Sequence, residues 1–191
     1  MYYESVNLSQ EIIVNKIVSI HYFEYMSNFS FPGETHDFWE FLYVDKGEVQ
    51  VIADDKNFTF KKGQIIFHKP NEFHALKANG RIAPNLVVIA FHCKSSSMHF
   101  LENKIFQVNE LEKNLLGKII IEAKKTYRSR LDDPYLKKLK KNTNPPFGGE
   151  QLIKISLENF LIELVRQYTL YDSVLPKKQL KSTKKNYDDD T

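Results

Sequence analysis

The sequence predicts a mainly β fold followed by C-terminal helices, and two patterns carry this prediction. Residues 12–93 contain at least seven short segments rich in β-branched and aromatic residues, each bounded by Gly, Pro, Asn or Asp. From residue 108 onwards, apolar residues recur instead at the spacing of one helix face. Short strands at close intervals, without helices between them, indicate a sandwich or barrel rather than alternating strand–helix units.

The expected strands lie between clear turn signals. The Pro32-Gly33 pair is expected to interrupt the chain, while Gly47 and Gly63 are expected to end strands in tight turns. The last segment is almost continuously apolar, which is typical of a strand that is covered on both faces. In order, the predicted strands span residues 17–25, 40–45, 49–53, 58–60, 64–68, 72–78 and 86–93.

Two helices are expected after the strands, one starting near residue 108 and one spanning residues 150–171. Between them, residues 128–144 are basic and contain Pro134, so a loop is predicted there. The apolar face of the first helix would consist of Leu111, Leu115, Ile119, Ala123 and Tyr127. That of the second would consist of Ile153, Leu157, Phe160, Leu164, Tyr168 and Tyr171, widened by Leu161 and Val165.

These patterns divide the chain into three parts. Residues 1–107 are predicted to form the β-barrel. Residues 108–175 are predicted to form a helical appendage that packs on the barrel, makes a dimer contact, or does both. Residues 176–191 have no apolar period, which indicates a solvated linker.

Composition and charge exclude several classes of protein. The formal net charge of +3 is too small to predict a nucleic-acid-binding surface over the whole chain. The single cysteine, Cys93, excludes an internal disulfide and fits a cytoplasmic protein. The first residues lack the basic start and apolar stretch of a secretion signal. No apolar run approaches the roughly 20 residues that span a membrane, so no membrane partner is expected.

The candidate site consists of His36, Glu40 and His74. Two histidines and a carboxylate can hold a divalent metal and leave coordination positions open. On one straight strand His36 and Glu40 would lie roughly 13 Å apart, too far to share an ion. They converge only if the chain bends at residues 37–39, and His74 must then arrive from the strand after Pro70.

Two other interpretations of these residues remain open. In the first interpretation, His36 and His74 are partly buried side chains that make hydrogen bonds to the backbone, and Glu40 accepts hydrogen bonds from nearby donors. Alternatively, an enclosed barrel with a few polar groups on an apolar lining would bind a small organic ligand without a metal, which we favour. His68 and His92 lack a supporting spacing, and His21 and His99 carry no readable chemistry. No Ser-His-Asp or Cys-His arrangement is present, so no catalytic residue is predicted.

The segment from His36 to His74 resembles a cupin barrel. His36-x-x-x-Glu40, followed after six residues by Gly47, is similar to the later part of the first cupin motif. Gly63, Pro70 and His74 are similar to the second motif. Glu34 stands where the first motif has a further histidine, and Glu72 stands near the position of a glycine in the second. These departures weaken the case for a catalytic metal, although Glu34 could supply an oxygen ligand.

A closer resemblance is to the N-terminal sensor domain of AraC-type transcription regulators. It is carried by the phrases HDFWEFLYVDKGEV, GQIIFHKPNEFHAL and FGGEQLIKISLENFLIELVR, in this order, over about residues 12–171. The resemblance implies a cupin-like double-stranded β-barrel, or jelly roll, followed by two or more α-helices. It also implies a cytoplasmic homodimer that senses a sugar or other metabolite and is not an enzyme.

The resemblance assigns roles to particular residues. Effector binding is expected at Glu34, His36, Phe38, Glu40 and His74. Dimerisation is expected on Leu157, Phe160, Leu161, Leu164 and Tyr168, which would otherwise pack on the barrel. No cofactor is required, and a divalent metal at His36, Glu40 and His74 is the alternative. The helix-turn-helix part of the family is expected to be missing here, so that DNA would be contacted only through that missing domain.

Two rival functions follow from the same residues. The first is a metal-dependent cupin enzyme of the isomerase or dioxygenase type, which needs a metal with open positions at His36, Glu40 and His74. The second is a purely structural oligomerisation module whose barrel is filled by side chains.

Overall fold

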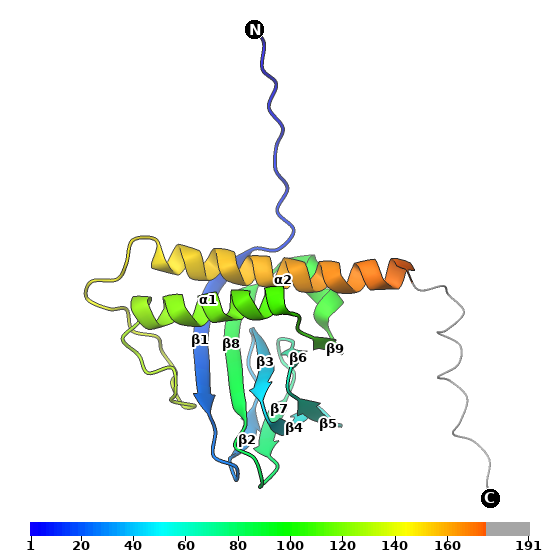
Figure 1. Cartoon of the computed structure of the whole chain (residues 1–191), viewed down its shortest axis with the longest axis vertical. Coiled ribbons are helices and arrows are strands. Elements are labelled where there is room, and N and C mark those ends of the chain that lie inside the picture. Colours follow the sequence, from blue (N-terminus) through cyan, green and yellow to red (C-terminus); the bar gives the residue numbers. More distant parts are fainter. Residues whose placement is uncertain (175–191) are drawn as a thin grey trace, which may run out of the picture.

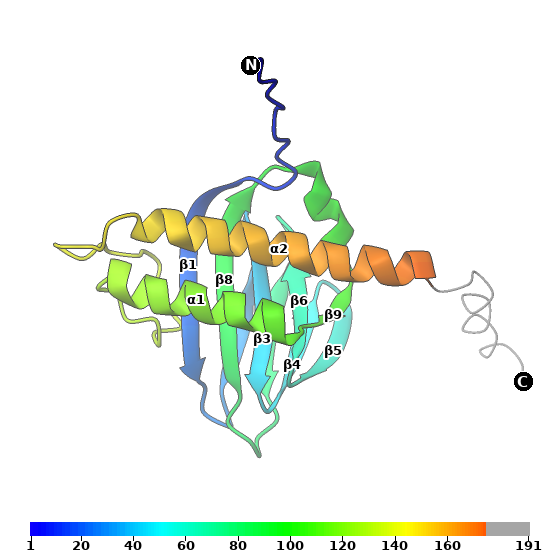
Figure 2. The same ribbon diagram turned by 45° about the horizontal axis from the view of Figure 1, so that its top comes forward.

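In the computed structural model of the chain, residues 1–174 are described, except for the side chains of Phe23 and residues 171–174. Two antiparallel sheets face each other, and two helices lie across the outer face of the larger sheet (Figures 1 and 2). This confirms the predicted fold class, a mainly β fold with C-terminal helices. The predicted linker at residues 176–191 lies outside the described residues.

The larger sheet has the strand order β1-β8-β3-β6-β9, and the smaller sheet has the order β2-β7-β4-β5. The strands are β1 (Val14–Glu24), β2 (Ser30–Glu34), β3 (Trp39–Lys46), β4 (Glu48–Ala53), β5 (Lys56–Lys61), β6 (Gln64–His68), β7 (His74–Ala78), β8 (Asn85–Cys93) and β9 (Ile105–Gln107). The helices are the short 3-10 helix η1 (Ser96–Leu101), α1 (Glu110–Thr126) and α2 (Gly149–Val174). Within the described residues, no helix is both long enough and apolar enough to cross a membrane.

Strand β3 separates two apolar cores, because its alternate side chains point to opposite faces of the larger sheet. One core lies between the two sheets, where Leu42 and Val44 of β3 are buried. The other lies between the larger sheet and the helices, where Trp39, Phe41 and Tyr43 are buried. The inner core consists of Tyr25, Leu42, Val44, Val49, Val51, Phe60, Ile66, Leu86 and Val88.

Helix α2 covers the outer face of the larger sheet with its apolar stripe. Leu157, Phe160, Leu161 and Leu164 are fully buried within the single chain, and the ring centroid of Phe160 lies 5.5 Å from that of Phe41. The expectation that these four side chains form a dimer contact is therefore corrected, since the outer face of the sheet already occupies them. Tyr168, the fifth predicted dimer residue, is half-buried against β9.

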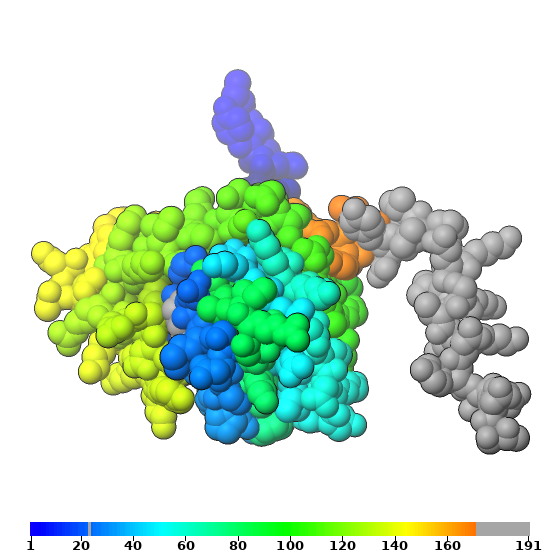
Figure 3. Space-filling model, turned by 60° about the horizontal axis from the view of Figure 1, so that its bottom comes forward, coloured from blue at the N-terminus to red at the C-terminus, as the bar shows by residue number. Residues whose placement is uncertain are grey.

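The long connection between the helices follows the prediction of a loop. It contains no helix or strand apart from one isolated bridge between Tyr127 and Lys141. The connection lies beside β1, as Figure 3 shows for the yellow-green segment next to the blue one. There the backbone N–H of Tyr22 donates to the carbonyl oxygen of Leu131 at 2.9 Å, and the Leu131 side chain is buried. The connection is thus fixed to the edge of the larger sheet.

Two strands were not expected. Pro32 and Gly33 lie inside β2 rather than interrupting the chain, so that prediction was wrong. β2 is an edge strand, where the missing N–H of a proline is tolerated, and its register shifts between Phe31 and Glu34. Gly33 has a φ of 106°, and a Cβ there would lie 2.4 Å from the ring of Phe73. Strand β9 has only three residues, too few to give a readable period.

One expectation about the helix faces was also wrong. Leu111, which was assigned to the buried face of the first helix, is exposed. It lies in the first turn of α1, between Asn109 and Glu112, which form the capping box of this helix. The buried face of α1 consists of Glu112, Leu115, Leu116, Ile119, Ile120, Ala123 and Thr126.

Replacing Phe160 by Ala is expected to lower the free energy of unfolding by about 3–5 kcal/mol, because the substitution leaves a cavity against Phe41. Leu152→Ala on the same helix is the matched control. Since Leu152 is 48% exposed, it should change stability by about 0.5 kcal/mol or less. Denaturant unfolding followed by circular dichroism measures both, and equal losses would contradict the assignment of the buried face.

Candidate functional site

The predicted bend exists and brings His36 to Glu40. β2 ends at Glu34 and β3 begins at Trp39, so His36 lies in the short connection and Glu40 lies inside the new strand. The backbone N–H of Asn71 donates to the carbonyl oxygen of His36 at 2.7 Å and fixes this connection to the turn before β7. The His36 Nε2 atom lies 3.8 Å from Glu40 Oε2.

His74 completes the cluster from the opposite sheet. It is the first residue of β7, and its Nε2 atom lies 3.4 Å from Glu40 Oε1. Glu34 pairs with His74 across the β2–β7 ladder. One ligating atom from each of Glu34, His36, Glu40 and His74 lies within 4.8 Å of all the others. We call these four residues the central cluster.

Phe38 also lies at the central cluster. Its ring stacks on that of His36 with centroids 3.8 Å apart, and it meets His92 edge-on at 5.6 Å. The structure therefore brings together all five residues that were predicted to bind an effector. Their role in binding stays a prediction.

Backbone hydrogen bonds fix which ring nitrogens face Glu40. The Nδ1–H of His36 donates to the carbonyl oxygen of Phe38 at 3.0 Å, and the Nδ1–H of His74 donates to that of Glu72 at 3.2 Å. A carbonyl can only accept, so each neutral ring carries its proton on Nδ1 and turns a bare Nε2 to the carboxylate. Both Nε2 atoms are buried without a hydrogen-bond partner in the described chain. Two lone pairs thus face a carboxylate, an arrangement that needs a proton, a hydrogen-bond donor or a cation.

The electrostatics assign that proton to His74. Burial lowers the pKa of His74, but the facing Glu40 carboxylate outweighs burial and raises the pKa overall. Burial raises the pKa of Glu40, and the neighbouring His74, His68 and His36 outweigh it and lower the pKa. Burial lowers the pKa of His36 despite the opposing effect of Glu40. At 3.4 Å, the His74–Glu40 contact is an ion pair that lacks good hydrogen-bond geometry.

The sequence reasoning missed a second buried pair. His68 Nδ1 and Glu72 Oε1 lie 2.8 Å apart, and the ring of His68 stacks on that of His74 with centroids 4.3 Å apart. The signal was present in the sequence, because His68 and Glu72 have the same four-residue spacing as His36 and Glu40. The turn at Asn71, with a φ of 67°, folds the two ends of that spacing together.

His21 was also underestimated. It is buried on β1, in register with Val88 of the inner core. Burial lowers its pKa, and the charge of Glu40 opposes this effect. Because the charge of Glu40 affects the pKa of His21, His21 lies near the central cluster. The sequence alone does not show this position, since it depends on the register of β1 with β8.

The donor set of the central cluster fits a divalent cation. Two imidazole nitrogens and one or two carboxylates are common ligands of zinc, iron and nickel. Metal-binding histidines usually donate their other ring N–H to a carbonyl or carboxylate, as His36 and His74 do. The same bare nitrogens and carboxylate could instead accept hydrogen bonds from the hydroxyl groups of a small molecule.

Replacing Glu40 by Gln should lower the pKa of His74, because burial then acts without the opposing Glu40 carboxylate. In the intact pair, protonated His74 adds stability below the unfolded histidine pKa, and this is lost as the pH rises through the folded pKa. Ionised Glu40 adds stability above the unfolded glutamate pKa, lost as the pH falls through its folded pKa.

Histidine NMR titrations in the presence of a chelator measure this effect. Glu102→Gln is the control, since it removes the carboxylate 2.6 Å from the exposed His99 and leaves the central cluster intact. A His74 pKa that is unchanged in Glu40→Gln would show that the ion pair does not set it.

Residues 16–91 match the family model of the AraC-like ligand binding domain. The matched segment contains all five residues that were predicted to bind an effector, and it also contains His68 and Glu72. No curated protein sequence matches the chain.

Several solved structures are distantly similar. The cupin domain of Cnp3 from Schizosaccharomyces pombe is 18% identical with a TM-score of 0.37, covering 46% of this chain and 65% of that chain. Apo ToxT from Vibrio cholerae is 14% identical with a TM-score of 0.47, covering 84% and 58%. The DMSP lyase DddQ from Ruegeria pomeroyi is 16% identical with a TM-score of 0.33, covering 46% and 40%.

The chain therefore spans less than two thirds of the length of each of these three proteins. The fold assignment depends on the two sheets and on the family match, and not on these distant structures. By that match, residues 16–91 of this chain are similar to the AraC-like ligand binding domain.

Proposed function

We propose that this chain is the small-molecule-sensing and dimerisation part of an AraC-type transcription regulator, and that its role is regulatory rather than catalytic. The observation that carries the proposal is the central cluster inside the segment that matches the ligand-binding family. Two buried imidazole nitrogens without hydrogen-bond partners lower the stability of a folded protein. In a binding site, however, a ligand can supply the missing hydrogen bonds.

The chemistry of the central cluster favours a hydroxyl-bearing effector. Hydroxyl groups can donate to the bare Nε2 atom of neutral His36 and to the Glu40 carboxylate, and they can accept from the Nε2–H of protonated His74. The ring of Phe38, stacked on His36, adds an apolar surface at the same place. A sugar or another small polyhydroxylated metabolite supplies both kinds of contact.

Strand β3 offers a route from the effector to the helices. Glu40 points into the space between the sheets, whereas its neighbour Phe41 points outward and packs on Phe160 of α2. An effector that changes the position of Glu40 would also bias the packing of α2. Binding would then shift the populations of two helix arrangements, which is how a sensing domain influences the rest of a regulator.

We propose that the functional form is a homodimer in which side chains other than the four buried ones make the contact. Leu157, Phe160, Leu161 and Leu164 are occupied within one chain. A sensing domain transmits its signal by repositioning two copies, so the oligomeric state is part of the proposal.

A metal-dependent cupin enzyme is the second candidate, and one observation favours it. The bare nitrogens of His36 and His74 and the Glu40 carboxylate have the composition of a metal site, and Glu34 adds a fourth ligand. These residues would hold the ion, which would supply Lewis-acid chemistry to a bound substrate. The remaining side chains near it, such as Phe38 and the His68–Glu72 pair, would orient that substrate.

Native mass spectrometry of the intact chain, with elemental analysis of the same sample, separates the two candidates. The sensor proposal expects a metal-free dimer that takes up a small organic molecule from a metabolite extract. His74→Ala should weaken that uptake about tenfold or more, because it removes a buried partner. His99→Ala is the control, since His99 is exposed on η1, away from the central cluster.

One metal ion per chain, lost in both His36→Ala and His74→Ala but retained in His99→Ala, would instead favour the enzyme. A chain that stays monomeric at high concentration and takes up no molecule from the extract would contradict the sensor proposal.

A further inference from the structure

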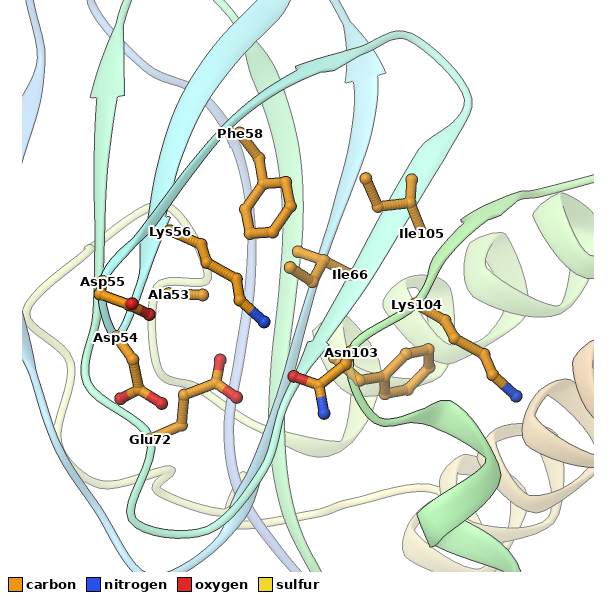
Figure 4. Close-up of a pocket in the computed structure, with 11 residues that line it drawn as sticks. Ala53, Asp54, Asp55, Lys56, Phe58, Ile66, Glu72, Asn103, Lys104 and Ile105 are labelled. Carbon is orange, nitrogen blue, oxygen red and sulfur yellow. The ribbon is translucent and has the colours of Figure 1, made fainter. Parts of the chain in front are cut away.

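A cavity of about 270 Å³ lies at one edge of the two sheets. None of the four central-cluster residues lines it, but Glu72, whose carboxylate contacts His68, does. The cavity opens between β5, the last strand of the smaller sheet, and β9, the last strand of the larger one. Its walls are formed by Ala53, Asp54, Asp55, Lys56, Phe58, Ile66, Phe67, Glu72, Asn103, Lys104 and Ile105. We call this the edge cavity (Figure 4).

Three polar side chains from different segments are turned toward the same space. Figure 4 shows the Lys56 ammonium, the Glu72 carboxylate and the Asn103 amide pointing toward one another across the edge cavity. No ion pair of residues 1–174 involves Lys56, which is exposed and follows Asp54 and Asp55 in the chain. Lys104 is turned away, since its ammonium lies 3.5 Å from the ring centroid of Phe100.

The carboxylate on the opposite wall is held in place. Glu72 is buried, and its Oε1 atom lies 2.8 Å from Nδ1 of His68, which leaves Oε2 as a further acceptor. Asp54 is occupied differently, because its Oδ1 accepts the backbone N–H of Phe73 at 3.0 Å. The edge cavity therefore presents the Lys56 ammonium and the fixed Glu72 carboxylate, with the amide of Asn103 beside them. The carboxylates of Asp54 and Asp55 also line it.

The remaining wall is apolar. Phe58 and Ile66 lie above the polar groups in Figure 4, and Ile105 closes the side toward β9. Ligand pockets typically combine such an apolar wall with a few converging polar groups, and drug-sized ligands need roughly 300–1,000 Å³. The edge cavity is slightly smaller, so its size suits a small metabolite.

We propose that the edge cavity is a second small-molecule site, distinct from the central cluster, for a short carboxylic acid that carries an ammonium or hydroxyl group near its carboxylate. The acid's carboxylate pairs with Lys56 and accepts from the Asn103 amide. Its ammonium or hydroxyl group donates to Glu72, and its side chain contacts Phe58 and Ile66. α-Amino acids and 2-hydroxy acids share this chemistry.

The position of the edge cavity links it to α2. The strand that follows Asn103, β9, is held by α2: the Tyr168 hydroxyl lies 2.5 Å from the backbone nitrogen of Gln107, and Gln167 Nε2 donates to its carbonyl oxygen at 3.1 Å. The ring of Phe106 also meets that of Tyr168 edge-on, with centroids 4.7 Å apart. A ligand that contacts Asn103 thus lies next to β9, the short strand against which Gln167 and Tyr168 of α2 pack.

Isothermal titration calorimetry of the full chain tests the site, with the common L-amino acids as one probe set and lactate, glycerate and malate as the other. At least one probe should bind saturably with one molecule per chain, and the set it comes from identifies the donor group. Lys56→Met should weaken that binding about tenfold or more, because it removes a charged partner. Asn103→Gly should also weaken it, and glycine accepts the φ of 56° at this position.

Lys62→Met is the matched control, because Lys62 is an exposed lysine beyond the same strand and does not line the edge cavity. Its affinity for the probe should equal that of the unaltered chain. Three results would overturn the proposal: no saturable binding of any probe at millimolar concentration, equal weakening by Lys56→Met and Lys62→Met, or binding that His36→Ala abolishes and Lys56→Met leaves intact. The last result would place the acid at the central cluster.

Discussion

The double burial of β3 is the constraint on which the rest of the structure depends. A strand covered on one face by a second sheet and on the other by a helix must supply apolar side chains in both directions, as Leu42 and Phe41 do. The same constraint explains why α2 lies where it does, since the outer face of the larger sheet would otherwise expose a broad apolar surface. It also fixes the position of Glu40, which points to the same inward side of β3 as Leu42 and Val44.

Placing ionisable groups beside such cores is costly, and the chain offsets the cost in two ways. Backbone carbonyls of Phe38 and Glu72 hold the imidazoles of His36 and His74, which removes one unpaired polar atom from each ring. Opposite charge on neighbouring residues then shifts Glu40 and His74 toward their charged forms. The Nε2 atoms of His36 and His74 remain without a hydrogen-bond partner in the described chain, and both lie beside the Glu40 carboxylate. This grouping is the feature expected of a binding site and not of a packing defect.

Much of this arrangement could be predicted from the sequence, because it depends on local signals. Turn residues such as Gly47 and Gly63 bounded the strands, and strand length required a bend before Glu40 if His36 and Glu40 were to meet. The approach of His68 to the central cluster was not predictable in the same way, since it depends on which strands pair. The apolar stripe of α2 was visible, but its periodicity is identical whether it covers a sheet or a second copy. Only the packed structure distinguishes these two uses of Leu157 and Phe160.

The position of Trp39 has a practical consequence. It is the only tryptophan of the chain, it opens β3, and it is buried in the core beneath the helices while the next residue, Glu40, faces the central cluster. Tryptophan fluorescence therefore comes from a single indole that lies at the junction between the central cluster and the helical layer. Changes in its emission would report on this strand without any attached dye, so that events at the interior site and at the helices can be followed optically in the unaltered protein.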